Sequence, residues 1–173
     1  MCGIYAYVGN KPAVPMLING IKKLEYRGYD SVGLSTIENK KEIVIHKVVG
    51  DTQKLKDKLS NKNLRGKIGI AHTRWATHGK ISVPNAHPHI SQNHDVAISH
   101  NGIIENYIEL KQELLNSNFI FQSDTDSEII AHFISKFLNE GFSLESSILM
   151  LLKKIRGAST VVGLPSISHL TLP

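Results

Sequence analysis

The sequence contains very little cysteine: a single residue, Cys2, in a chain of 173. One cysteine cannot form an internal disulfide or a cysteine-rich zinc site. Glycine and proline, with 13 and 6 residues, are too few for a collagen-like or low-complexity chain. No apolar run approaches the roughly 18 residues that a membrane-spanning helix needs. The N-terminus lacks the basic region of a secretory signal, so we expect a cytoplasmic protein without a membrane association.

The remaining composition is that of an ordinary globular protein. Hydrophobic residues make up 41% and charged residues 20% of the chain, which excludes disorder as its main state. The length fits one domain, since domains commonly have about 100–200 residues. We therefore expect a single folded unit with a substantial core.

Positive charge exceeds negative charge, giving a formal net charge of +5. Much of the excess lies between Lys40 and Lys67, where lysine dominates and no aromatic residue is interleaved. Stacking platforms and arginine forks that read bases are therefore missing from this segment. We expect a solvated lysine-rich face and no nucleic-acid binding, while a basic, non-catalytic interaction protein remains an alternative.

Apolar periodicity predicts the secondary structure. Period-two patterns rich in β-formers predict strands at residues 2–8, 32–37, 43–49, 68–73 and 96–100. Helical spacing predicts helices at about 12–26, 107–116, 129–138 and 143–155, and a short one capped by Asp51 or Thr52. Residues 123–126 would cap the third of these helices, and 79–95 would form a long loop. Sequential strands with clustered helices indicate an α+β layered fold with antiparallel sheets.

The position of Cys2 directly after the initiator methionine suggests chemistry. Removal of Met1 would leave Cys2 with a free α-amine, whose ordinary pKa is about 7.7–8.0. Such an amine can take the proton of the thiol on the same residue, as in N-terminal nucleophiles. The alternative is a small buried hydrophobic residue at the start of a strand. Position alone leaves both interpretations open.

Three further polar features lie where predicted elements end. Arg74 has the planar fork that binds a carboxylate, and Asp126 can pair with an ammonium group. Asn101 and Gly102 combine a side-chain amide with a flexible backbone N–H, as an oxyanion hole requires. Taken singly, Arg74 suits a surface ion pair equally well. For Asp126 a plain helix cap is the commoner role, and for Asn101-Gly102 it is a hairpin turn. Together with a thiol, they describe a site for a free amino acid with a side-chain carbonyl.

The longer motifs resemble a known family. Cys2-Gly3-Ile4, the Arg-Gly-Tyr-Asp-Ser stretch from Arg27, the His-Thr-Arg-Trp-Ala-Thr-His-Gly stretch from His72 and Asn101-Gly102 are similar to the glutaminase domain of glutamine–fructose-6-phosphate aminotransferases. These are class II glutamine amidotransferases with an αββα N-terminal nucleophile hydrolase sandwich. The resemblance covers residues 2–159. Residues 160–173 diverge and an isomerase domain is absent, so we expect an incomplete, C-terminally truncated domain.

The resemblance implies roles at matching positions. Cys2 would be the nucleophile, with the oxyanion held by Asn101 and Gly102. The α-carboxylate of the substrate would bind Arg74, Thr77 and His78, and its α-ammonium Asp126; Arg27 and Trp75 would support the site.

The implied reaction is hydrolysis of the L-glutamine amide without a cofactor. Its ammonia would serve the synthesis of glucosamine 6-phosphate from fructose 6-phosphate on a separate isomerase domain or chain. A homodimer is compatible with the resemblance. An inactive truncated fragment or a glutamine-binding remnant remains the alternative.

Histidines gather in the middle of the chain, which raises the question of a metal site. The members of the group are His72, His78, His87, His89, His94 and His100. Histidine without spaced carboxylate or cysteine ligands is a weak metal signal. We therefore expect no metal.

Overall fold

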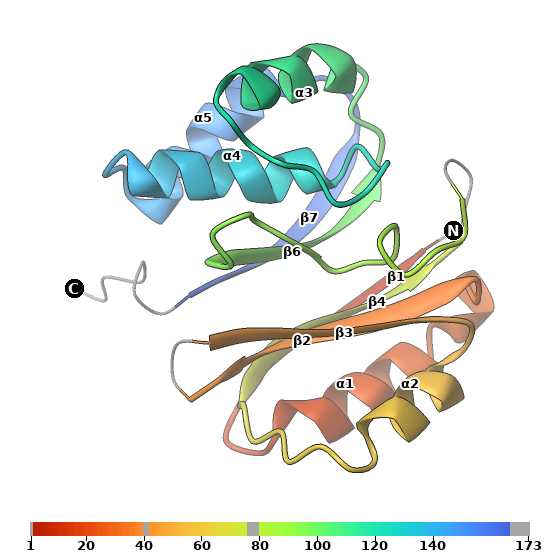
Figure 1. Ribbon diagram of the computed structural model, residues 1–173. Helices are drawn as coiled ribbons and strands as arrows, with labels where there is room; N and C mark the ends of the chain where they lie inside the picture. The colour runs from red at the N-terminus through yellow and green to blue at the C-terminus, as the bar shows by residue number, and fades with distance from the viewer. Residues whose placement is uncertain (1, 40–41, 76–79, 167–173) are drawn as a thin grey trace.

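The computed structural model describes residues 2–39, 42–75 and 80–166. They form four layers, in which two antiparallel sheets face each other and helices cover the outer face of each sheet (Figure 1). This arrangement confirms the predicted α+β layered fold with antiparallel sheets.

The first sheet has four strands in the order β1-β4-β2-β3. Their bounds are Gly3–Val8 for β1, Ile68–Arg74 for β4, Ser31–Glu38 for β2 and Glu42–Val49 for β3. Its outer face is covered by α1 (Ala13–Lys22) and α2 (Thr52–Leu59), at the bottom of Figure 1. A 3-10 turn, η1, spans Glu25–Arg27.

The second sheet has three strands in the order β5-β6-β7. These strands are β5 (His89–Ile90), β6 (Val96–Gly102) and β7 (Ser159–Pro165). The helices over it are α3 (Tyr107–Asn116), α4 (Glu128–Asn139) and α5 (Leu144–Lys154), at the top of Figure 1. Within the described ranges, none of the helices combines the length and apolar character required to cross a membrane.

Three apolar cores hold the four layers together. One joins α1 and α2 to the first sheet, with Leu17 and Leu34 fully buried. Another joins the second sheet to α3, α4 and α5 around Phe133. The third lies between the sheets and contains Ile70 of the first sheet and Leu164 of the second. Burial of apolar surface at each interface is the main force that stacks the layers.

Alternation along β4 decides which side chains reach the functional end of the fold. Ala71 belongs to the core under the helices, whereas Ile70 belongs to the core between the sheets. Successive side chains of a strand point to opposite faces. His72 and Arg74 therefore share the inner face with Ile70 and point toward the second sheet.

The structure departs from the sequence prediction at several places. The first helix ends at Lys22, and η1 follows as a separate turn. The expected loop at 79–95 contains β5, and β7 (Ser159–Pro165) lies where no strand was predicted.

The two predicted helix caps have different outcomes. Of the two candidates, Asp51 and Thr52, it is Asp51 that caps α2, by accepting a hydrogen bond from the backbone N–H of Lys54. The predicted cap of α4 within residues 123–126 is wrong. Ser127 occupies the cap position without a side-chain capping bond. The carboxylate of Asp126 instead accepts a hydrogen bond from the backbone of Ile104.

The core under α4 gives a test of the layer packing. Ile130 is fully buried on α4, whereas Ile108 on α3 is 72% exposed. We expect Ile130→Ala to lower the free energy of unfolding by about 2–5 kcal/mol, because it leaves a cavity. Ile108→Ala, the same change on a solvent-facing helix position, should alter it by less than about 0.5 kcal/mol. Urea unfolding of both variants measures the difference, and equal effects would contradict the assigned packing.

Candidate active site

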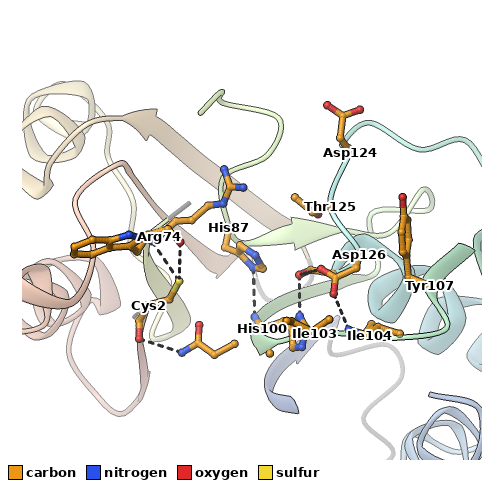
Figure 2. A pocket seen from close by; sticks show the side chains of 14 residues that line it. Cys2, Arg74, His87, His100, Ile103, Ile104, Tyr107, Asp124, Thr125 and Asp126 are labelled. Atoms are coloured by element: carbon orange, nitrogen blue, oxygen red, sulfur yellow. Dashed lines mark hydrogen bonds between the residues drawn. The ribbon is translucent and has the colours of Figure 1, made fainter. Parts of the chain in front are cut away.

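A pocket of about 420 Å³ opens where β1 begins, where β4 and β6 end and where the chain enters α4 (Figure 2). It therefore collects segments that are far apart in the sequence. The residues that line it are Cys2, Arg74, Trp75, His87, His100, Asn101, Gly102, Ile103, Ile104, Tyr107, Asp124, Thr125, Asp126 and Ser127. Six of the residues to which the sequence analysis gave a role in the site thus meet in one place: Cys2, Arg74, Trp75, Asn101, Gly102 and Asp126.

Cys2 is held in the pocket by the pairing of β1 with β4. Gly3 pairs with Thr73, and its N–H donates to the Thr73 hydroxyl at 3.1 Å. The backbone N–H of Trp75 donates to the Cys2 sulfur at 3.3 Å, and the sulfur lies 3.7 Å from the Trp75 carbonyl oxygen. Cys2 is half-buried. The sulfur is thus fixed at the end of β4 while it borders the pocket.

The side chain of Asn101 bridges the two sheets. Its Nδ2 donates to the carbonyl oxygen of Cys2 at 3.2 Å, and its Oδ1 lies 2.9 Å from His72 Nε2. The hairpin-turn interpretation of Asn101-Gly102 is wrong, because both residues belong to β6 and pair with β7. An amide donor is thereby placed beside the half-buried cysteine.

Gly102 occupies a position that excludes a side chain. Its φ is +151°, and a Cβ there would lie 2.3 Å from the carbonyl oxygen of Ala158. The next N–H, that of Ile103, donates to the same Ala158 oxygen at 3.3 Å. Because N–H groups alternate in direction along a strand, the N–H of Gly102 points away from β7.

The loop before α4 carries Asp126 into the pocket wall (Figure 2). One carboxylate oxygen of Asp126 accepts from the N–H of Ile104 at 2.8 Å, and the other accepts from the Ser127 hydroxyl at 3.3 Å. An ionised carboxylate offers about four acceptor sites, so Asp126 retains capacity for a cationic ligand.

Hydrogen bonds tie the same loop to the rest of the fold. Glu128 accepts from the N–H and the hydroxyl of Ser123, at 2.8 and 2.6 Å. Burial acts to raise the pKa of Glu128, but contacts with His132, Ser123 and the backbone outweigh it and lower the pKa to about 2. The Thr125 hydroxyl lies 3.0 Å from His89 Nε2. These bonds keep Asp126 in place.

The remaining predicted residues differ in their relation to the pocket. Arg74 is 6% exposed, lines the pocket and donates from Nη1 to the carbonyl oxygen of Lys80 at 3.3 Å. The Trp75 ring is 43% exposed and packs edge-on against Tyr29. Arg27 lies in η1 and is not among the lining residues. Thr77 and His78 fall outside the described residues.

Buried histidines form the wall behind the pocket. The His72 and His87 rings stack with their centroids 4.2 Å apart, and His87 meets His89 edge-on at 4.4 Å. His87 Nδ1 accepts from the backbone N–H of His100 at 3.3 Å. Among the described residues, no three histidine, cysteine or acidic side chains form a group that could hold a metal ion.

Residues 56–143, half of the chain, match the model of the glutamine amidotransferase domain. This chain belongs to the glutamine amidotransferase family. It is 48% identical over 162 residues to the glutamine–fructose-6-phosphate aminotransferase of Francisella tularensis, covering 93% of this chain and 26% of that protein. The corresponding enzyme of Aquifex aeolicus is 47% identical over 158 residues, again covering 26% of its length. The chain thus spans about a quarter of these curated relatives.

Solved amidotransferase structures have the same architecture. The glutamine phosphoribosylpyrophosphate amidotransferase of B. subtilis superposes with a TM-score of 0.79 at 28% identity, covering 95% of this chain and 35% of that chain. A glutamine aminotransferase class-II domain protein from Silicibacter pomeroyi shares the fold with a TM-score of 0.60 at 15% identity. The fold is therefore the αββα sandwich of N-terminal nucleophile amidotransferases.

The histidine wall of this amidotransferase domain is uncharged at neutral pH. Burial lowers the pKa of His72 to about 4, although the hydrogen bond with Asn101 opposes the shift. Burial, with the charges of the neighbouring histidines, holds the pKa of His87 well below its usual range. Sequence reasoning missed this wall. The one signal in the sequence was the local density of histidine, which raised the question of a metal site and gave no prediction of buried neutral rings.

The lack of space for a side chain at Gly102 predicts that a single added methyl group lowers the stability of the fold. We expect Gly102→Ala to destabilise the amidotransferase domain by about 1–3 kcal/mol, because the added Cβ meets Ala158 and the φ is unfavourable for alanine. Gly163 in β7 is a matched control, since its Cβ would find nothing nearer than 4.0 Å. Thermal unfolding of both variants measures the difference. A Gly102→Ala protein as stable as Gly163→Ala would contradict the described backbone.

The depressed histidine pKa values predict how stability depends on pH. Below pH 6.5 the unfolded chain protonates its histidines, whereas folded His72 stays neutral down to about pH 4. The free energy of unfolding should therefore fall as the pH drops through this window, by up to about 1.4 kcal/mol per pH unit and histidine. The stability that ionised Glu128 contributes to the fold is lost only as the pH falls from 4.5 toward 2. Urea unfolding at pH 7.5, 6 and 5 tests this. His72→Gln should reduce the fall, and an unchanged slope would contradict the assignment.

Proposed function

We propose that this chain hydrolyses the side-chain amide of L-glutamine, with Cys2 as the nucleophile. The observation that carries the proposal is the 3.2 Å hydrogen bond from the Asn101 amide to the carbonyl of Cys2, which places a donor beside a cysteine that borders the pocket. Membership of the glutamine amidotransferase family supports glutamine as the substrate.

In the proposed first step, the Cys2 sulfur attacks the side-chain amide carbon of glutamine. The thiol proton passes to the α-amine of Cys2, which removal of Met1 would make available as a base. A sulfur–carbon bond forms and the carbonyl electrons move to oxygen. The second amide hydrogen of Asn101 and the N–H of Gly102 would stabilise this oxyanion.

The other end of the substrate would bind through opposite charges. Arg74, with Thr77 and His78, would hold the α-carboxylate, and Asp126 the α-ammonium. Support comes from the pocket, to which Arg74 and Asp126 contribute cationic and anionic side chains from different layers. Bidentate geometry makes arginine a strong carboxylate partner.

The second half of the reaction releases both products. The protonated amine donates to the departing nitrogen, the carbon–nitrogen bond breaks, and ammonia leaves a γ-glutamyl thioester on Cys2. Water then attacks the thioester through a second oxyanion, and glutamate is released. Trp75, with its backbone at the sulfur and an exposed ring, would border the exit of ammonia, and Arg27 would support the site.

The relatives suggest a use for the ammonia. The similar proteins are named glutamine–fructose-6-phosphate aminotransferases. We therefore propose that residues 2–159 form a glutaminase domain, although β7 continues through Pro165. The ammonia would convert fructose 6-phosphate to glucosamine 6-phosphate on an isomerase domain or chain beyond these residues, in the cytoplasm. A homodimer of the assembly remains part of this proposal.

Replacing the nucleophile tests the proposal. We expect Cys2→Ala to lower glutamate release from L-glutamine by at least about 10⁴-fold, because no other thiol is present in the chain. Glutamine binding measured by calorimetry should persist. Intact mass on the same samples reports whether Met1 has been removed.

Two outcomes would count against this function. Undiminished turnover by Cys2→Ala would remove Cys2 as the nucleophile. A wild-type chain that binds glutamine yet releases no glutamate would support the glutamine-binding remnant instead. Leu17→Ala, which removes core volume remote from the pocket, controls for effects of stability on activity.

A further inference from the structure

His72 is a buried group that the proposed reaction does not use directly. It lies on the inner face of β4, is 1% exposed and has its Nε2 at 2.9 Å from Asn101 Oδ1. The ring therefore stands behind the Asn101 side chain, which joins the two sheets at Cys2.

The network around Asn101 fixes the orientation of its amide. Nδ2 faces the carbonyl oxygen of Cys2, an acceptor that only an N–H group can satisfy. A flipped amide would place its oxygen against the carbonyl oxygen of Cys2, with no proton between the two. With the oxygen of Asn101 thus turned toward His72, the imidazole must donate from Nε2. His72 and the Cys2 carbonyl together hold both ends of the amide.

The imidazole is equipped for a donor role. Burial lowers its pKa to about 4, although the hydrogen bond with Asn101 opposes the shift, so the ring carries one proton at neutral pH. Nδ1 is buried and has no hydrogen-bond partner in the part of the chain that the structure describes. The proton is therefore accounted for by Nε2, where its acceptor lies.

Packing prevents the imidazole from turning away. The ring stacks on His87 with an interplanar angle of 21°. His87 is itself fixed, since its Nδ1 accepts from the His100 backbone. His72 pairs in the sheet with Gly33, where a Cβ would lie 2.3 Å from the His87 carbonyl oxygen. Glycine at this position thus admits the segment that carries the stacking ring.

We propose that His72 is a positioning residue that orients the Asn101 amide, so that its free N–H points to the oxyanion formed at Cys2. This inference rests on the proposed function, in which Asn101 stabilises the oxyanion. Because the oxyanion exists only in the transition state and intermediates, loss of His72 should affect kcat and leave the binding of glutamine nearly unchanged.

A pair of substitutions tests this role in the full chain. His72→Phe keeps a ring but removes the donor, and we expect kcat for glutamine hydrolysis to fall about 10²-fold with KM changed less than about threefold. His72→Gln places an amide N–H near the position of Nε2 and should restore kcat at least about tenfold relative to phenylalanine. His46→Phe on β3, outside the pocket lining, is the matched control and should keep its kcat.

An aldehyde analogue of glutamate distinguishes an effect on the oxyanion from an effect on ground-state binding, because it forms a tetrahedral adduct and glutamate does not. The Cys2 sulfur adds to its carbonyl carbon, the thiol proton passes to the α-amine of Cys2, and the π electrons of the carbonyl move onto the oxygen of the tetrahedral adduct. We expect His72→Phe to weaken the binding of this analogue about 10²-fold. The affinity for glutamate itself should stay within about threefold of the wild-type value. Equal losses for both ligands would assign His72 a merely structural role and overturn the proposal.

A measurement on the unmutated protein covers the case in which the phenylalanine variant does not fold. Nitrogen-15 shifts of the His72 ring at pH 7 should show the tautomer protonated at Nε2. A tautomer protonated at Nδ1 would overturn the proposal, because Nε2 could not donate to Asn101. A wild-type chain without glutaminase activity would overturn the proposed function and this role with it. An active chain in which His72→Phe keeps its kcat would overturn the role of His72 alone.

Discussion

The contact on which the site depends is the hydrogen bond from the Asn101 amide to the carbonyl of Cys2. It joins β6 of the second sheet to the residue that precedes β1 of the first, across 99 positions of sequence. Neither sheet contains the site by itself. The spacing of the cysteine and the amide is therefore set by the packing of the two sheets, and the apolar core that contains Ile70 and Leu164 has a direct bearing on the chemistry.

The space between the sheets changes character along a single strand. The inner face of β4 begins with apolar side chains that seal the sheets and ends with His72 and Arg74. Polar groups in such a place must be neutral or hydrogen-bonded, because burial of an unpaired charge is costly. Neutral imidazoles meet this condition and still supply donors and acceptors. The histidine wall thus lies between the packed apolar core and the open pocket.

The sequence was sufficient for most of the fold. Alternating apolar residues predicted β2 and β3, and Asp51 correctly predicted the cap of α2. Two strands were not predicted. The two residues of β5 are too few to show a periodicity, and the pairing of β7 with a strand far away in the sequence leaves no local pattern.

Site residues were predictable where their chemistry is specific. Cys2, Arg74 and Asp126 were selected for a thiol, a cation and an anion, and the pocket contains all three. The support around them was not predictable. That His72 faces Asn101 depends on the register of β4 and β6 in two different sheets. That Asp126 bonds to Ile104 instead of capping α4 depends on how the loop crosses the end of β6.

The pairing of Gly102 with Ser159 has a consequence for the order in which the molecule forms. Ribosomes make the cysteine first, its amide partner about a hundred residues later, and the strand that borders the glycine later still. Contacts so remote in sequence form slowly and close large loops. A nascent polypeptide therefore carries its thiol long before Asn101 and Gly102 can take their places beside it.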